Sequence, residues 1–244
     1  MKRFITYDDI TIYDKDIYSD NRRAGYNIGD LLNMPSLHNI WNQCPHADKS
    51  MLYRMNNVGN CYENSILSLY CKNRNSCDEI IPNIQLIKDV VLQFTNENKH
   101  NYIDIFNLIQ EQTTLCVHVR NGDLDTEESY IDSIIRLSSN YKYVVLLTGI
   151  HLDETYKSTE LKKQNILNTI NSILQKNNNI YVYIDKQDVH LTLMMFASNL
   201  LVHKGGFSCL GSIVSMNNLF ITQLFTYVKC SNWINLVNRK YILI

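Results

Sequence analysis

The sequence lacks the features that mark several classes of protein. Its 23 Lys and Arg residues nearly balance 24 Asp and Glu residues, so a net charge of -1 provides no basic field to attract nucleic acid or anionic lipid. No apolar run approaches the ~20 residues that cross a bilayer. The N-terminal segment reaches Asp8 and Asp9 too early for a secretory signal peptide. We therefore expect a cytoplasmic protein with no membrane span and no nucleic-acid partner.

Disulfide and metal-binding patterns are missing as well. The seven cysteines are odd in number and scattered, and no CxxC pair occurs among them. The histidines outside the motifs described below show no ligand spacing: His38, His46, His100, His151 and His190. We therefore expect reduced thiols and no metal site.

The second half of the chain alternates short apolar runs with stretches of helical periodicity. Hydrophobic residues make up 45% of the 244 residues, which is enough for a packed core. The expected strands are 114–119, 143–149, 180–184, 199–203 and 219–222. The expected helices are 158–175, a helix through 191–196 with Asp188 as its N-cap, and one that follows Gly205-Gly206 and runs through Val214. This alternation predicts an α/β fold with a doubly wound parallel sheet.

The first hundred residues are less regular. Segments 62–71, 83–95 and 103–109 are expected to be helical, and residues 5–6 and 11–13 to be strands. We interpret the chain as a smaller α/β lobe at 1–110, the sheet lobe at 111–222, and a segment at 223–244 that packs back on the first lobe.

The sharpest motif is the segment from Cys116 to Asp123, CVHVRNGD, which lies where an expected strand ends. Ligands of open parallel sheets bind beyond the carboxyl ends of the strands. Arg120 there can hold a diphosphate through two parallel hydrogen bonds, and Gly122 allows the backbone to approach a ligand. Asp123 is a candidate to orient the guanidinium or to transfer a proton. A polar turn with a surface Arg–Asp pair is the alternative.

A second motif runs from Val202 to Ser212, VHKGGFSCLGS, and again indicates a strand, a Gly-rich turn and a helix. Free N–H groups at a helix N-terminus beside a Ser hydroxyl form an anion site, here made by Gly205, Gly206, Phe207 and Ser208. Turn geometry alone explains a Gly-Gly pair equally well. The expected position at the same sheet edge as Arg120 favours the anion site.

Two carboxylates complete the set of candidate site residues. Asp185 follows the strand 180–184 and can accept from the amino group of a purine or from a ribose hydroxyl, whereas helix capping is the simpler role for Asp188. Asp30, within YNIGDLL at 26–32, is a candidate general base for an acceptor hydroxyl, with helix capping as the alternative.

These motifs carry a family resemblance. Residues 115–123 resemble the H-x-R-R-G-D/N segment of the α-1,2-, α-1,6- and protein O-fucosyltransferase group. Residues 188–222 resemble that group's closing segment, where an S/G-T/G-F-S turn follows a strand. The likeness covers roughly 110–222. It implies a GT-B fold of two Rossmann-type lobes, with the first lobe reduced and on the acceptor side, and a GDP-sugar donor, usually GDP-fucose, bound by the second.

The resemblance also implies roles for individual residues. Arg120 would hold the β-phosphate and His118 would face the ribose or base. Gly206, Phe207 and Ser208 would line the diphosphate and nucleoside, with Asp185 near the base. Asn121 stands where the group has a second Arg, and the Gly-rich acceptor-side motif of the α-1,2 enzymes is missing, which leaves the donor sugar open.

The sequence therefore predicts an inverting, metal-independent glycosyltransferase that needs no cofactor and transfers a sugar from a nucleotide diphosphate sugar to a glycan or glycoprotein hydroxyl. Arg120, Asp30 and Asp123 are the candidate catalytic residues. Two alternatives stay open. The Asn-x-Gly-Asp phrase at 27–30 resembles polysaccharide pyruvyltransferases, which would use phosphoenolpyruvate. A catalytically inactive GT-B-like module that binds nucleotide or glycan is the other.

Overall fold

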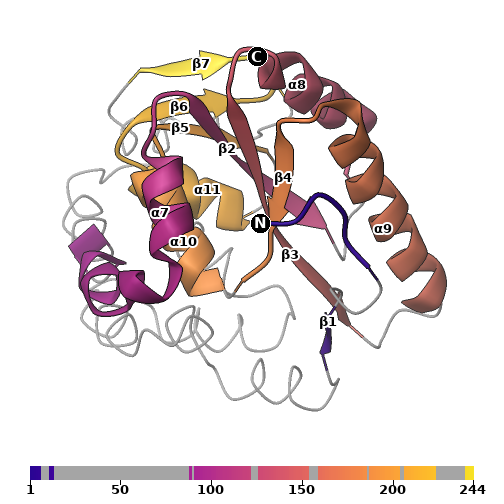
Figure 1. Cartoon of the computed structure of the whole chain (residues 1–244), viewed down its shortest axis with the longest axis horizontal. Coiled ribbons are helices and arrows are strands. Elements are labelled where there is room, and N and C mark those ends of the chain that lie inside the picture. Colours follow the sequence, from indigo (N-terminus) through magenta and orange to yellow (C-terminus); the bar gives the residue numbers. More distant parts are fainter. Residues whose placement is uncertain are drawn as a thin grey trace, which may run out of the picture.

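A computed structural model gives the fold. It describes residues 1–6, 11–13, 88–89, 91–121, 126–153, 159–185, 187–203, 206–223 and 240–244. Within these ranges the chain is an α/β protein whose central parallel sheet carries helices on both faces (Figure 1). The predicted α/β fold with a doubly wound parallel sheet is confirmed. Most of 1–110 lies outside the described residues, so the two-lobed arrangement stays a prediction.

The sheet contains seven described strands, and every pairing between them is parallel. They are β1 Thr11–Tyr13, β2 Thr114–Asn121, β3 Tyr143–Asp153, β4 Ile180–Tyr183, β5 Asn199–Val202, β6 Asn218–Ile221 and β7 Tyr241–Leu243. Across the sheet they lie in the order β4-β3-β2-β5-β6-β7, while β1 pairs with the last residues of β3. Counted along the chain from β2, the order is 3-2-1-4-5-6, as in dinucleotide-binding doubly wound folds.

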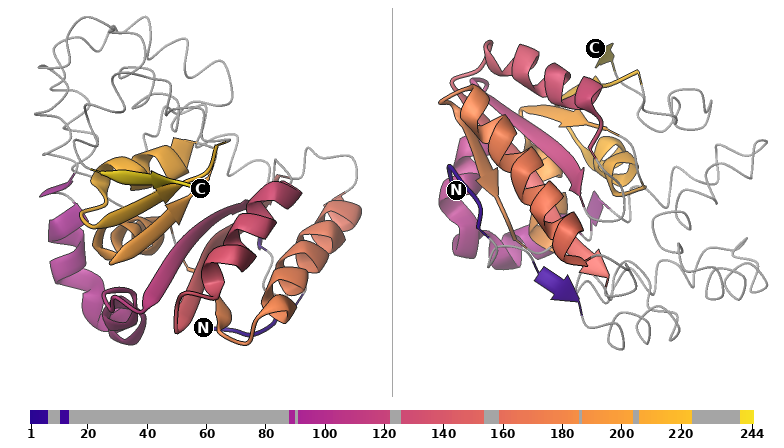
Figure 2. Two further views of the ribbon diagram at one scale, coloured as in Figure 1. Left: turned by 90° about the horizontal axis from the view of Figure 1, so that it is seen from above. Right: turned by 90° about the vertical axis from the view of Figure 1, so that its right-hand side faces the viewer.

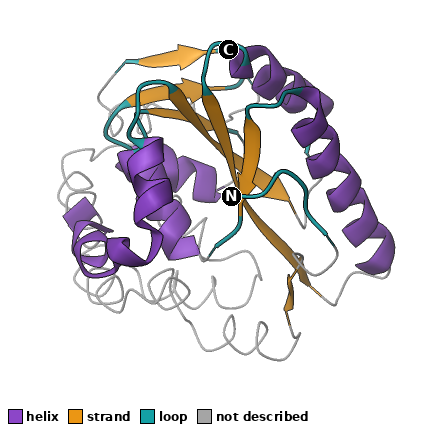
Figure 3. Cartoon of the chain, viewed as in Figure 1, coloured by secondary structure: helices purple, strands orange, loops and turns teal. Residues whose placement is uncertain are grey.

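Helices join the strands and cover both faces of the sheet (Figures 2 and 3). They are α7 Ile103–Ile109, α8 Glu128–Ser138, α9 Thr159–Lys176, α10 Gln187–Phe196 and α11 Gly206–Val214, with the 3-10 helix η2 Lys99–Tyr102 before α7. Residues 88–89 and 91–98 are helical as well. The crossovers β2-α8-β3 and β3-α9-β4 cover one face, and α7, α10 and α11 cover the other.

The alternation of side chains along the strands creates these two cores. In β2, Leu115, Val117 and Val119 pack with α8 and α9, whereas Cys116 packs with α7, α10 and α11. All four side chains are buried, which explains why the strand reads as a continuous apolar run. Gly211 brings α11 close to α10, because a Cβ there would lie 2.6 Å from the Met194 sulfur.

Several expected elements differ from the structure. Residues 5–6 are not a strand, because the Asn171 side chain bonds the backbone N–H and C=O of Ile5 and so takes the place of a neighbouring strand. Asp188 lies within α10, which begins at Gln187, and so it is not the N-cap. Helix α8 is an element that the periodicity analysis did not include. The segment 62–71 lies outside the described residues.

Parts of the predicted first and third segments contact the sheet. Val91, Ile105, Phe106 and Ile109, from helical parts of 1–110, belong to the core beneath α10 and α11. At the other end of the chain, β7 pairs with β6 and extends the sheet, whereas 224–239 lie outside the described residues.

Candidate functional site

The strand order creates a topological switch point between the ends of β2 and β5, the position at which open α/β sheets have their ligand-binding crevice. These two strands are neighbours, yet β2 leads into α8 on one face of the sheet and β5 leads into α11 on the other. The connections therefore diverge at the carboxyl edge. Both sequence motifs reach this edge: the first ends just after β2, and the second begins at the last residue of β5 and continues into α11.

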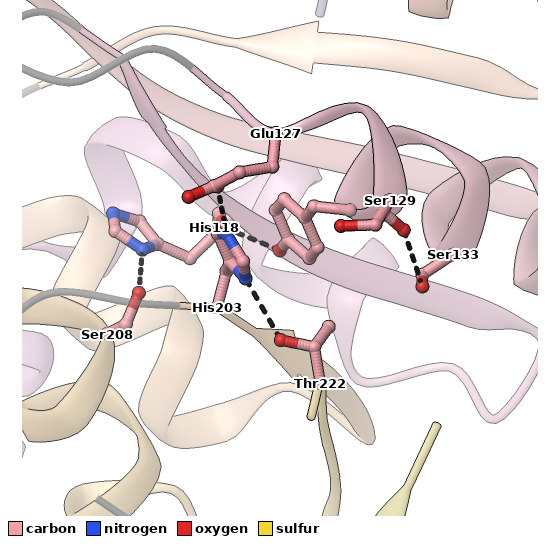
Figure 4. Close-up of polar contacts among 8 residues, drawn as sticks. His118, Glu127, Ser129, Ser133, His203, Ser208 and Thr222 are labelled. Carbon is pink, nitrogen blue, oxygen red and sulfur yellow. Dashed lines mark hydrogen bonds and ion pairs between the residues drawn. The ribbon is translucent and has the colours of Figure 1, made fainter. Parts of the chain in front are cut away.

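At the switch point, the buried side chains of His118 and Ser208 bring the two motifs into contact. The Nδ1 atom of His118 lies 2.6 Å from Oγ of Ser208, although the residues are 90 positions apart (Figure 4). His118 belongs to β2, and Ser208 lies in the first turn of α11. The Phe207 ring lies beside the imidazole, with 5.3 Å between the ring centroids. The structure thus joins three residues that the sequence predicted for one donor site.

A second histidine, His203, follows β5 directly and lies in a closed polar cluster. Its Nε2 atom lies 2.6 Å from Oε2 of Glu127, and its Nδ1 atom lies 2.9 Å from Oγ1 of Thr222 (Figure 4). Its ring stacks on Tyr130 with centroids 4.0 Å apart and planes 10° apart. We name Glu127, Tyr130, His203 and Thr222 the His203 cluster.

Chemistry fixes the proton on one nitrogen of His203. An ionised carboxylate only accepts hydrogen bonds, so Nε2 carries the hydrogen that bonds Glu127. The other nitrogen, Nδ1, accepts from the Thr222 hydroxyl when the ring is neutral and donates to it when the ring is charged. The cluster therefore accommodates both states of the imidazole without losing a hydrogen bond.

Tyr130 links the His203 cluster to the strand that carries His118. Its hydroxyl donates to the backbone carbonyl of His118 at 2.7 Å. Burial, and to a smaller extent the neighbouring Cys116, raises the pKa of the Tyr130 phenol well above its ordinary value. Tyr130 is therefore a neutral donor over the physiological pH range. Through it, α8 holds both walls of the crevice.

Asp185 lies beyond the end of β4, two strands from β2. The Tyr183 hydroxyl donates to Oδ2 of Asp185 at 2.5 Å. The backbone N–H of Asp185 donates to Nε2 of His190 at 3.2 Å. With strands spaced at ~4.8 Å, Asp185 lies roughly 10 Å along the edge from β2. Burial, followed by the hydrogen bond to Asp185, raises the pKa of Tyr183, so this phenol also stays protonated.

The structure describes the remaining predicted site residues in part. Arg120 lies in β2 with Gly149 of β3 as its register partner, and only its backbone is described. Gly206 is the first residue of α11. Four predicted residues lie outside the described ranges: Asp30, Gly122, Asp123 and Gly205.

No sequence motif pointed to a role for the His203 cluster. One signal was available, because His203 ends the apolar run 199–203 just before the Gly-rich turn. A second was the four-residue spacing of Tyr130, Ile134 and Ser138, the buried face of α8. No sequence signal paired Glu127 with His203, since 76 residues separate them.

Searches of protein-family models, of curated proteins and of solved structures found nothing that matches this chain. In the described ranges, no helix combines the length and apolar character of a membrane span. The same ranges contain no group of three or more His, Cys, Asp or Glu side chains arranged to hold a metal ion. Within the described residues, the chain is an α/β protein with a Rossmann-like parallel sheet and polar side chains at its topological switch point.

Proposed function

We propose that this protein is a glycosyltransferase that uses a nucleotide diphosphate sugar, with a GDP-sugar as the favoured donor and a glycan or glycoprotein hydroxyl as acceptor. One observation carries the proposal: His118 and Ser208, from two motifs 90 residues apart, lie 2.6 Å from each other at the switch point. Motifs that resemble two segments of one donor site thus share one crevice.

The chemistry of the crevice suits a diphosphate. Helix α11 begins at Gly206, so its unpaired N–H groups and positive dipole end favour an anion beside Ser208. On the opposite wall, Arg120 in β2 would add a two-pronged contact that Lys cannot reproduce. His118 and Phe207 would border the nucleoside, and Asp185 would recognise the base farther along the edge.

The proposed reaction is a direct displacement with inversion and without a metal. The acceptor oxygen attacks the anomeric carbon, and the bond from that carbon to the diphosphate breaks. Arg120, oriented by Asp123, and the N–H groups of the Gly205-Gly206 turn would neutralise the charge that develops on the leaving group, which is stabilisation specific to the transition state. In a GT-B arrangement, residues before 88 would form most of the acceptor lobe, including Asp30.

Binding and turnover test the proposal together. GDP, UDP, TDP and CMP are compared by thermal shift, since a ligand that binds only the native state raises the melting temperature. Release of nucleotide from the matching sugar donors follows, with phosphoenolpyruvate as a further donor. We expect GDP to give the largest shift. Transfer from phosphoenolpyruvate would instead show a pyruvyltransferase, and binding without turnover an inactive module.

The variant Ser208→Ala links this test to the structure. It removes the hydroxyl that bonds His118, so we expect the GDP shift to fall by more than half. Ser212→Ala is the matched control, because Ser212 is a buried serine one turn farther along the same helix. Equal loss in both variants, or no shift with any nucleotide, would contradict the proposed donor site.

A further inference from the structure

Glu127 occupies an unusual place at the crevice. It is the N-cap residue of α8, but its side chain makes no capping hydrogen bond to the start of that helix. A carboxylate at this position usually gains stability from the free N–H groups. Instead, its Oε2 atom lies 2.6 Å from Nε2 of His203, across the switch point at the end of β5. The carboxylate is thus directed at the ligand-binding edge.

Burial decides which member of the pair can meet a bound molecule. In most carboxylate–histidine pairs the carboxylate orients the imidazole, and the imidazole transfers the proton. Here the His203 side chain is only 2% exposed, whereas 34% of the Glu127 side chain is exposed. Both ring nitrogens of His203 are also hydrogen-bonded, to Glu127 and Thr222. Of the two side chains, Glu127 is therefore the one that a bound molecule can reach.

The surroundings of His203 make it a rigid support for this carboxylate. Thr222 holds Nδ1, and the Tyr130 ring stacks on the imidazole face at 4.0 Å. The imidazole donates to one carboxylate oxygen, which fixes the plane of the carboxylate. A general base needs this combination of fixed direction, negative charge and access to the proton that it removes.

We propose that Glu127 is the general base of the transfer reaction and that His203 is its positioning residue. This inference rests on the proposed function. The proton of the acceptor hydroxyl passes to the Glu127 carboxylate as the acceptor oxygen bonds the anomeric carbon. The bond between that carbon and the diphosphate oxygen breaks, and its electron pair leaves with the diphosphate. Glu127 then holds the role for which the sequence suggested Asp30 or Asp123.

Glu127→Gln tests the base directly. The amide oxygen can still accept the hydrogen bond from His203, but the side chain can no longer take a proton. With GDP-fucose, or whichever donor of the panel is consumed, we expect kcat for donor hydrolysis and transfer to fall ~100-fold or more. The donor KM and the GDP thermal shift should stay unchanged. Glu128→Gln makes the same charge change at the next, exposed residue and should keep kcat within about twofold of wild type.

A double-mutant cycle tests the positioning role. We expect His203→Asn to lower kcat about tenfold without raising the donor KM, and to cost nothing further in the Glu127→Gln background. If the two substitutions lower kcat by factors that multiply in the double variant, His203 supports the fold without acting through Glu127. An active Glu127→Gln variant would overturn this inference and leave the proposed function intact. A wild-type protein that consumes no donor would overturn both.

Discussion

His118 lies within β2 and His203 directly follows the neighbouring strand β5, yet the protein holds the two side chains differently. Each has its Nδ1 atom within hydrogen-bond distance of a hydroxyl, from Ser208 in one case and Thr222 in the other. His203 additionally bonds Glu127 and stacks on Tyr130. His118 instead has a tilted contact with the ring of Phe207, on the helix that begins at the crevice.

This difference shows that the position of a histidine at this edge of the sheet does not by itself determine its role. The partners of His203 come from α8 and from the end of β6, so they tie separate elements together and build a wall. The Ser208 hydroxyl and the Phe207 ring, which contact the imidazole of His118, lie in the first turn of α11, where a diphosphate would bind. We therefore expect changes at Tyr130, His203 and Thr222 to lower stability in addition to any effect on turnover, and changes near His118 to affect binding first.

The largest expected effect comes from Tyr130→Ala. It removes a fully buried ring, the stack on His203 and the hydrogen bond to the His118 carbonyl. Truncating a buried aromatic side chain costs ~3–5 kcal/mol in the free energy of unfolding, which urea denaturation measures. Tyr130→Phe keeps the ring and should cost only about 1 kcal/mol. A loss below about 1 kcal/mol in the Ala variant would show that the cluster does not hold the crevice together.

Arg120→Lys should lower activity while leaving stability almost unchanged. The ammonium keeps the charge but cannot make two parallel bonds to a diphosphate. Loss of a charged hydrogen bond costs ~1.5–3 kcal/mol, which corresponds to roughly a 10- to 150-fold lower kcat/KM. Arg136→Lys, at an exposed position in α8, is the matched control. Near-normal turnover with an unchanged donor KM would show that Arg120 is not the diphosphate clamp.

Parallel Asn substitutions compare the two histidines directly. His203→Asn should cost ~1.5–3 kcal/mol of unfolding free energy, because it leaves a carboxylate and a buried hydroxyl without their partner. His118→Asn should cost about 1 kcal/mol, the value of one neutral hydrogen bond. Thermal shifts with GDP should be retained in the first variant and reduced in the second. The reverse pattern would exchange the roles of the two histidines.

The sheet was predictable because its strands are buried on both faces. Val144 to Leu147 pack alternately with the two helical layers, so the run is apolar throughout. Helix α8 was harder to predict because it buries a single narrow face, in which a serine, Ser138, takes one of the positions. Residues 5–6 were misassigned because a side chain, Asn171, replaces the neighbouring strand, and no local pattern reveals such a contact.

The site residues likewise divide into those that a local sequence pattern predicts and those that depend on the tertiary structure. His118 and Ser208 were predictable because each lies in a local motif at a strand end. The contact of His203 with Glu127 depends on β5 lying beside β2, although β3 and β4 come between them in the chain. Periodicity indicates strands without indicating which of them are neighbours. A cluster assembled from the ends of two strands and one helix therefore requires the tertiary structure.

The contact between Tyr183 and Asp185 at the end of β4 is a third polar contact that can be compared with those of the two histidines. It can be tested by the pH dependence of stability. Burial and the hydrogen bond to Asp185 raise the pKa of Tyr183, so the folded state favours the neutral phenol. An unfolded Tyr titrates near pH ~10, and stability should therefore be constant below about pH 9 and fall as the pH rises further. One such group changes the unfolding free energy by at most ~1.4 kcal/mol per pH unit, and less here because water screens a half-buried pair.

Tyr183→Phe should therefore be less stable than wild type at pH 7, and the gap should narrow as the pH rises from about 9 to 11. The control is Tyr141→Phe, because burial raises the pKa of Tyr141 without a carboxylate contact among its causes. The stability difference between Tyr141→Phe and wild type should narrow less over the same pH range. Denaturant melts at several pH values measure both. A Tyr183→Phe gap that stays constant would show that the phenol is not held neutral by Asp185, and that this carboxylate is as open to a ligand as the predicted base-recognition role requires.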